Sequence, residues 1–108
     1  MKFLTISRLK DSFFTISPEL QMQLVAGVTA FADKNRKAGK LKEIYNVPGL
    51  KMIVGIWEAE SAEESTRLFL ENPMFPFMDV ETYTLSDWGT MTKAWKEAME
   101  RRAAAMKK

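Results

Sequence analysis

Two carboxylates stand two residues apart in the stretch ENPMFPFMDVETYTL, which spans residues 71–85. The second half of this stretch alternates between apolar and polar residues, which is typical of a β-strand. Asp79 and Glu81 would then lie on one face of the strand, about 6.6–6.8 Å apart along it. They are too far apart to share one proton, but both could flank one bound molecule. Such a carboxylate can act as the base for a carbon acid if burial raises its pKa.

Other side chains could assist this chemistry. A tyrosine hydroxyl could donate a hydrogen bond to a substrate oxygen, and an arginine could bind a substrate carboxylate through two hydrogen bonds. The candidate catalytic residues are Asp79, Glu81 and Tyr45, and the candidate substrate-binding residues are Arg8, Tyr83 and Trp57. The alternative is structural: the carboxylates are solvated or paired with Lys or Arg across a dimer, and the aromatic residues only pack.

The composition excludes several classes of site. The 108 residues include no cysteine and no histidine. Disulfides, zinc sites built on thiolate or imidazole, Ser-His-Asp triads, catalytic cysteines and histidine-ligated haem are therefore excluded. We expect no cofactor and no metal.

Charge and hydropathy narrow the range of partners. The net charge is only +2, and no basic face is interleaved with aromatic residues, so we expect no nucleic-acid partner. No apolar run approaches the roughly 20 residues that span a bilayer, and the first ten residues lack a signal core. We expect a cytoplasmic protein without a membrane partner.

The chain divides into short elements with clear local signals. Ser17 and Pro18 are typical of a helix start, and Gly39 of its end. Val47-Pro48-Gly49-Leu50 fits a type II turn. We predict a strand at 1–10, a helix at 15–39, a hairpin at 40–60, a helix at 61–73, a strand at 76–85 and a helix at 86–108.

Two helices have further distinguishing residues. Ser61 and Glu64 form a capping box at the start of the second helix. In the first helix, Leu20, Leu24, Val28 and Phe31 recur at helical spacing and are predicted to be its buried stripe. We expect Gly27 in that helix to permit close packing against the sheet.

This order predicts one α+β domain over residues 1–108, with a core at 1–85 and a helical extension at 86–108. The core is a ferredoxin-like βαββαβ fold, in which a four-stranded antiparallel sheet carries both helices on one face. The purely apolar sets should face the helices; they are Leu4, Ile6, Ile44, Met78 and Val80. The opposite, mixed sets are Phe3, Thr5, Ser7, Glu43, Tyr45, Phe77, Asp79, Glu81 and Tyr83. Because this second face is too aromatic to remain in water, we expect a second copy to cover it.

The stretch NPMFPFMDVE resembles the Pro-x-Phe-Pro-aromatic-Met-Asp-x-Glu signature of the muconolactone isomerase family. The helix ending at Gly39 and the helix capped by Ser61 fall at matching spacings, so the resemblance covers residues 17–85. It implies a dimeric α/β barrel, often a larger oligomer of dimers. It also implies a cofactor-free isomerase that moves a proton and a double bond on a small ring compound or aromatic acid.

The chain departs from the family pattern in three respects. Family isomerases carry charged residues in the middle of the first helix, where this chain has Val25, Gly27 and Val28, and they carry histidines elsewhere, whereas this chain has none. They also end in a short polar tail, where this chain has a long methionine-rich helix. We therefore expect weak or no turnover of muconolactone itself. The alternatives are a cofactor-free monooxygenase or cyclase on the same fold, or a non-enzymatic binding or assembly protein.

The last helix carries an apolar stripe of Trp88, Met91, Trp95, Met99 and Met106. We expect this stripe to pack at a subunit interface or across the barrel mouth.

Overall fold

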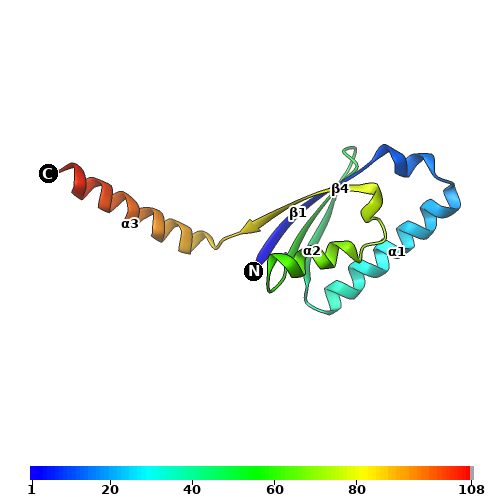
Figure 1. Ribbon diagram of the computed structural model, residues 1–108, viewed down its shortest axis with the longest axis horizontal. Helices are drawn as coiled ribbons and strands as arrows, with labels where there is room; N and C mark the ends of the chain where they lie inside the picture. The colour runs from blue at the N-terminus through cyan, green and yellow to red at the C-terminus, as the bar shows by residue number, and fades with distance from the viewer. Residues whose placement is uncertain (108) are drawn as a thin grey trace.

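The computed structural model describes residues 1–107, arranged as a sheet-and-helix body from which one helix projects (Figure 1). The elements are β1 (Lys2–Leu9), η1 (Asp11–Thr15), α1 (Pro18–Lys37), β2 (Leu41–Val47), β3 (Met52–Glu58), α2 (Ala62–Leu70), η2 (Phe75–Phe77), β4 (Met78–Leu85) and α3 (Trp88–Met106). The strands form one antiparallel sheet in the order β2-β3-β1-β4. The predicted βαββαβ order with an added C-terminal helix is confirmed.

The element boundaries lie where local signals placed them. The Ser17 hydroxyl accepts a hydrogen bond from the Leu20 amide at 3.2 Å, which caps α1. Gly39 follows this helix with a φ of +75°, a conformation that favours glycine. In the hairpin turn, Gly49 has a φ of +81° and the Leu50 amide donates to the Val47 carbonyl at 3.3 Å, as a type II turn requires.

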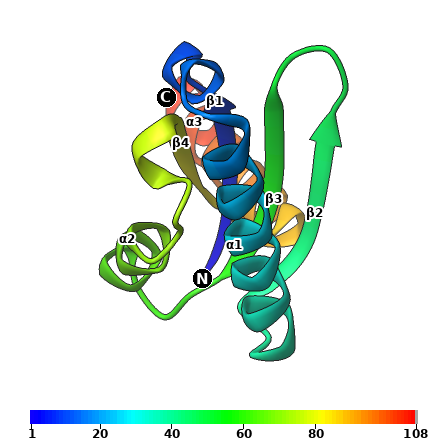
Figure 2. The ribbon, with the colours of Figure 1, turned by 90° about the vertical axis from the view of Figure 1, so that its right-hand side faces the viewer.

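Both body helices cover the same face of the sheet (Figure 2). One core cluster joins α1, α2 and the sheet through Phe31, Phe69, Trp57, Phe3 and Leu41, together with Ala59. A second cluster gathers Phe13, Met74 and Met78 near η1 and η2. Because α1 and α2 each contribute one large aromatic ring to the first cluster, burial of these rings holds both helices on the sheet.

The orientation of β1 contradicts the prediction. Phe3, Thr5 and Ser7 are buried beneath the helices, whereas Leu4 and Ile6 are half-buried on the opposite face. Thr5 lies opposite Gly55 in the sheet, and its hydroxyl accepts a hydrogen bond from the Trp57 indole at 3.1 Å. Thr5 can therefore be buried because its hydroxyl finds a partner and space there. Apolar character alone did not identify the covered face.

Three smaller expectations were also wrong. Phe77 belongs to η2 rather than to the strand, and its ring packs near Phe13 with centroids 6.2 Å apart. Leu20 is 40 % exposed, so the buried stripe of α1 begins after it. Gly27 faces Pro73 rather than the sheet, since a Cβ at Gly27 would lie 2.9 Å from the Pro73 Cγ. The loop after α2, and not a strand, therefore requires a small residue there.

The helix α3 continues the line of β4 away from the body (Figure 1). The molecule is elongated as a result, with principal extents of 71 × 29 × 23 Å. Asp87 caps the helix by accepting a hydrogen bond from the Thr90 amide at 3.0 Å. None of the helices within residues 1–107 combines the length and the apolar character needed to cross a membrane.

Candidate functional site

The face of the sheet that carries no helix, called here the open face, holds five of the six candidate site residues. Strand pairing places Glu81 opposite Ile6, Ile6 opposite Val54, and Val54 opposite Tyr45. These four residues form one row across the sheet. Arg8 and Asp79 are paired in the same way one step along the strands, as are Leu4 and Tyr83 on the other side.

Three of these residues form a hydrogen-bonded group, called here the Glu81 cluster: Arg8, Glu81 and Tyr83. The Tyr83 hydroxyl donates to Glu81 Oε2 at 2.6 Å, and Arg8 Nη1 donates to Glu81 Oε1. The cluster joins β1 and β4, which are neighbours in the sheet. Strand register thus places a carboxylate in contact with both a phenol and a guanidinium.

Within one copy, hydrogen bonds dominate the electrostatics of the cluster. The hydrogen bond from Tyr83, followed by the hydrogen bond and charge of Arg8, lowers the pKa of Glu81 below its usual value. The same contact with Glu81 raises the pKa of Tyr83. The expected rise in the carboxyl pKa requires burial by a second copy; within one copy Glu81 remains 45 % exposed, and its contacts with Tyr83 and Arg8 prevail. Glu81 is therefore ionised and Tyr83 protonated at neutral pH.

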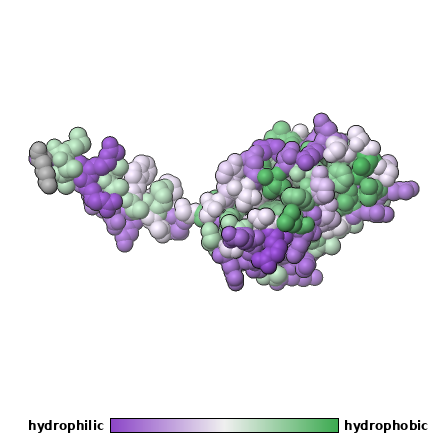
Figure 3. All heavy atoms as spheres, viewed as in Figure 1, coloured by the Kyte–Doolittle hydropathy of each residue, from purple (hydrophilic) through white to green (hydrophobic). Residues whose placement is uncertain are grey.

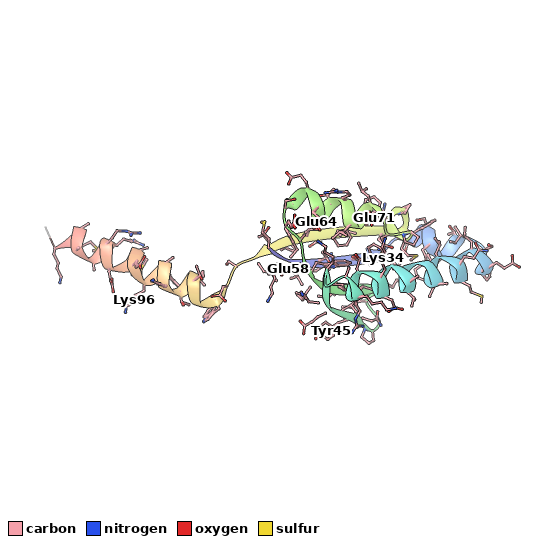
Figure 4. The ribbon with its side chains drawn as sticks, turned by 90° about the horizontal axis from the view of Figure 1, so that it is seen from below. Lys34, Tyr45, Glu58, Glu64, Glu71 and Lys96 are labelled. Atoms are coloured by element: carbon pink, nitrogen blue, oxygen red, sulfur yellow. The ribbon has the colours of Figure 1, made fainter. Side chains whose placement is uncertain are left out.

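Asp79 and Tyr45 lie outside the cluster. The Asp79 side chain is 75 % exposed, and its Oδ1 is 3.8 Å from Lys10 Nζ. Tyr45 lies on the opposite edge strand, three strand spacings or roughly 14 Å from Glu81, and its hydroxyl donates to Glu43 at 3.2 Å. Figure 4 shows Tyr45 on the side of the body away from α2. One copy alone therefore cannot bring Tyr45 to Glu81.

Trp57 lies on the other face of the sheet and lines a separate space, called here the inner cavity. This cavity lies between the sheet and the helices. Its lining residues are Thr5, Ser7, Val28, Phe31, Ala32, Leu41, Ile44, Ile53, Gly55, Trp57, Phe69, Asn72 and Met78. The sheet backbone separates it from the Glu81 cluster, so Trp57 cannot share a binding site with Arg8 and Tyr83 within one copy.

The inner cavity is mostly apolar with a few hydrogen-bonding groups. Its volume is about 40 Å³. A space of this size would hold a water but not an aromatic ring, which needs about 150 Å³. It is also far below the range for ligand pockets, about 300–1,000 Å³. All thirteen lining side chains are neutral, so the cavity offers hydrogen bonds but no carboxylate base.

Sequence reasoning missed the polar residues of this cavity. Thr5 and Ser7 were expected on the open face, and Asn72 and Gly55 were not singled out. The available signal was the spacing of Thr5, Gly55 and Trp57: a hydroxyl and a glycine on adjacent strands leave space for an indole. A Cβ at Gly55 would lie 2.7 Å from Trp57 Nε1, which explains why no larger residue fits there.

Comparison with known proteins agrees with the fold. The family model described as muconolactone delta-isomerase matches residues 1–91. The chain belongs to the muconolactone delta-isomerase family. A curated relative, the muconolactone delta-isomerase of Rhodococcus opacus, is 27 % identical over 78 residues, which cover 72 % of this chain and 84 % of that protein. The family match includes the whole body and ends within the first turn of α3.

Solved structures of similar fold support the architecture. A crystal structure of muconolactone isomerase matches with a TM-score of 0.72 at 22 % identity, over 81 % of this chain and 90 % of that chain. A 5-chloro-2-hydroxyhydroquinone dehydrochlorinase from Burkholderia phenoliruptrix, in complex with 2,5-dihydroxybenzoquinone, matches with a TM-score of 0.60 at 14 % identity. It covers 83 % of this chain and 98 % of that chain. At these identities the two structures establish the fold of the family and not the reaction.

Proposed function

We propose that this chain is a cofactor-free isomerase that moves a proton, and with it a double bond, within a small ring compound. The observation that carries the proposal is the Glu81 cluster in a member of the isomerase family. The reaction is redox-neutral, since one carbon loses a proton and another gains one. A carboxylate base and donors for a developing oxyanion are sufficient for it.

The cluster supplies these groups in a defined order. When the carbonyl oxygen of a substrate accepts the hydrogen bonds of Arg8 and Tyr83, Glu81 loses the contacts that lower its pKa. Its carboxylate then becomes a stronger base and removes a proton from a ring carbon. The electron pair of that C–H bond moves toward the carbonyl, where Arg8 and Tyr83 stabilise the enolate oxygen. Glu81 then returns the proton to a second carbon of the conjugated system.

A second copy of the chain is part of this proposal. Leu4, Ile6, Val54 and Ile56 lie half-buried on the open face, and a site that excludes water needs a cover there. We propose a dimer in which two open faces meet, as the family resemblance implies. Asp79 and Glu81 would then lie beneath a second sheet, and Tyr45 of the second copy could reach the cluster that Tyr45 of the same copy cannot.

The test replaces the base and follows proton exchange. Glu81→Gln should lower turnover of unsaturated lactones or phenols about a hundredfold or more, since general bases contribute at least that much. Solvent deuterium entering the ring is the readout, and Glu58→Gln, a carboxylate on the same face, is the matched control. Equal turnover by both variants would disprove the role of Glu81. Turnover that stops without dioxygen would indicate the monooxygenase alternative.

The neutral inner cavity favours a second candidate function, which is binding of a small ring compound without turnover, once the lining side chains move apart to admit it. Its hydroxyl and indole donors could orient one oxygen of a phenol or lactone, but no lining group could take a proton. Loss of one hydrogen bond weakens binding by roughly 0.5–1.5 kcal/mol, about two- to tenfold. Thr5→Val should weaken phenol binding by that factor in calorimetry, whereas Thr82→Val on the exposed part of β4 should not. Equal affinities would exclude the cavity as the binding site.

A further inference from the structure

The helix α3 presents an apolar stripe that its own body does not cover. Trp88 is 73 % exposed and Trp95 59 % exposed, and Met91, Met99 and Met106 are exposed on the same helix. These residues recur at spacings of three, four and seven, so they share one face. Two exposed tryptophans on one helix face are unusual for a surface in water and typical of an interface anchor.

The body has an apolar groove of its own between α2 and β4. It is lined by Thr66, Phe69, Leu70, Phe75, Val80 and Thr82, and its volume is about 150 Å³. Leu70 is 61 % exposed at the rim, and Phe75 is also exposed. Figure 3 shows hydrophobic side chains gathered between β4 and α2, bordered by hydrophilic atoms over α2. The groove therefore matches the stripe in polarity.

The two surfaces also match in charge. Residues 60–71, which include α2, contain four carboxylates and one arginine, and one of the carboxylates, Glu64, is paired with Lys40. In contrast, α3 carries the four cations Lys93, Lys96, Arg101 and Arg102 against the two carboxylates Glu97 and Glu100. Complementary potentials of this kind select a partner and fix its orientation. Lengths agree as well, since α3 is about 28 Å long and β4 about 27 Å.

We propose that α3 of one copy lies in the α2–β4 groove of a second copy, and that the exchange is reciprocal. Within one copy, α3 runs away from the groove in line with β4 (Figure 1). To fold back onto its own body, it would have to reverse direction at Ser86 and Asp87, where Asp87 already caps the helix. Exchange between two copies keeps this geometry and closes under twofold symmetry. The family match ends at residue 91, so this contact uses a segment mostly outside the matched region.

The absence of cysteine from the sequence permits a direct test with full-length chains. One variant carries Ala98→Cys beside the stripe, and a second carries Thr66→Cys in the groove. The two are mixed, treated with a short bismaleimide and analysed by mass spectrometry. We expect cross-links between Ala98→Cys chains and Thr66→Cys chains. Ala104→Cys, an equal change on the opposite face of α3, is the control and should give about tenfold fewer cross-links.

Other outcomes would overturn the inference. Cross-links only between two α3 helices would show that the stripe pairs with itself. If the double variant Ala98→Cys/Thr66→Cys links only within one chain, at a yield independent of concentration, α3 folds back on its own body. A lack of any cross-link to the groove would exclude the groove as its partner. None of these results depends on turnover, so they are separable from the test of Glu81.

Discussion

Gly55 is the residue on which the shape of the inner cavity depends most directly. A Cβ there would lie 2.7 Å from Trp57 Nε1 and 3.0 Å from the Thr5 hydroxyl oxygen. Gly55→Ala must therefore displace the indole and break its hydrogen bond to Thr5. We expect a loss of about 1–3 kcal/mol in the free energy of unfolding, measured in urea, with an altered near-UV spectrum.

The control for this prediction is Gly89→Ala in the first turn of α3. There the nearest atom to the added Cβ is the Asp87 Oδ2 that caps the helix, at 3.2 Å, and alanine favours a helix. A loss of stability in Gly89→Ala as large as that in Gly55→Ala would show that the effect is not specific to the cavity.

Glu64 gives the body a pH dependence at the residue scale. Its carboxylate accepts hydrogen bonds from Lys40 Nζ and from the Glu60 amide, and these lower its pKa. A carboxyl whose pKa is lowered by folding stabilises the fold above its unfolded pKa, about 4.3. That contribution is lost as the pH falls through the lowered, folded value.

The corresponding prediction concerns acid unfolding. Glu64→Gln should reduce stability at pH 7 and flatten the decline in stability between about pH 5 and pH 3. Thermal melts across that range are the measurement, and Glu63→Gln, which neutralises the neighbouring exposed carboxylate, is the control. An unchanged slope in Glu64→Gln would contradict the assignment.

At the scale of elements, local signals were sufficient for the order and ends of helices and strands. These signals depend only on a few neighbouring residues, so sequence alone reveals them. They are the helix caps at Ser17 and Ser61 and the positive φ angles at Gly39 and Gly49. The orientation of β1 could not be read in this way, because Leu4 and Ile6 are as apolar as core residues. Which face is covered depends on α1 and α2, and on the space around Gly55.

The candidate site was predictable to a similar extent. Alternation in β4 correctly placed Asp79, Glu81 and Tyr83 on one face, and the register with β1 added Arg8. Tyr45 and Trp57 lie away from that group, on another strand and on the other face of the sheet. Their positions could not be predicted, because the order of the strands and the direction in which each strand faces are properties of the whole sheet. Single strands show the spacing of side chains but not their neighbours on other strands.

The helix α3 is predicted to act in assembly and not in folding. Both core clusters consist of residues from the body. After deletion of residues 86–108, the far-UV circular dichroism spectrum should therefore still be that of a folded body. The shortened chain should form a smaller oligomer than the full chain, because the groove loses its occupant. Light scattering at micromolar concentration measures the number of copies in the oligomer. The same number of copies in the shortened and the full chain would contradict this role.

At the scale of the whole molecule, two distinct surfaces are proposed to join copies: the open face and the α3 groove. Ile6 lies at the centre of the open face, between Val54 and Glu81. In the chain shortened at residue 85, Ile6→Lys should convert the dimer to a monomer, since a buried unpaired charge is strongly unfavourable. Leu50→Lys, at an exposed position of the hairpin turn, should leave the dimer intact. Light scattering gives the mass of each variant, and a dimer of the Ile6→Lys variant would contradict the open face as the interface.

The distribution of the three tryptophans makes the protein its own optical reporter. Trp57 is buried in the body, whereas Trp88 and Trp95 stand in water on α3. Indole emission moves to shorter wavelength when water is excluded, so most of any concentration-dependent blue shift would arise from α3. Trp57→Phe would remove the constant background signal, and dilution of that variant would then follow the release of α3 without an added dye.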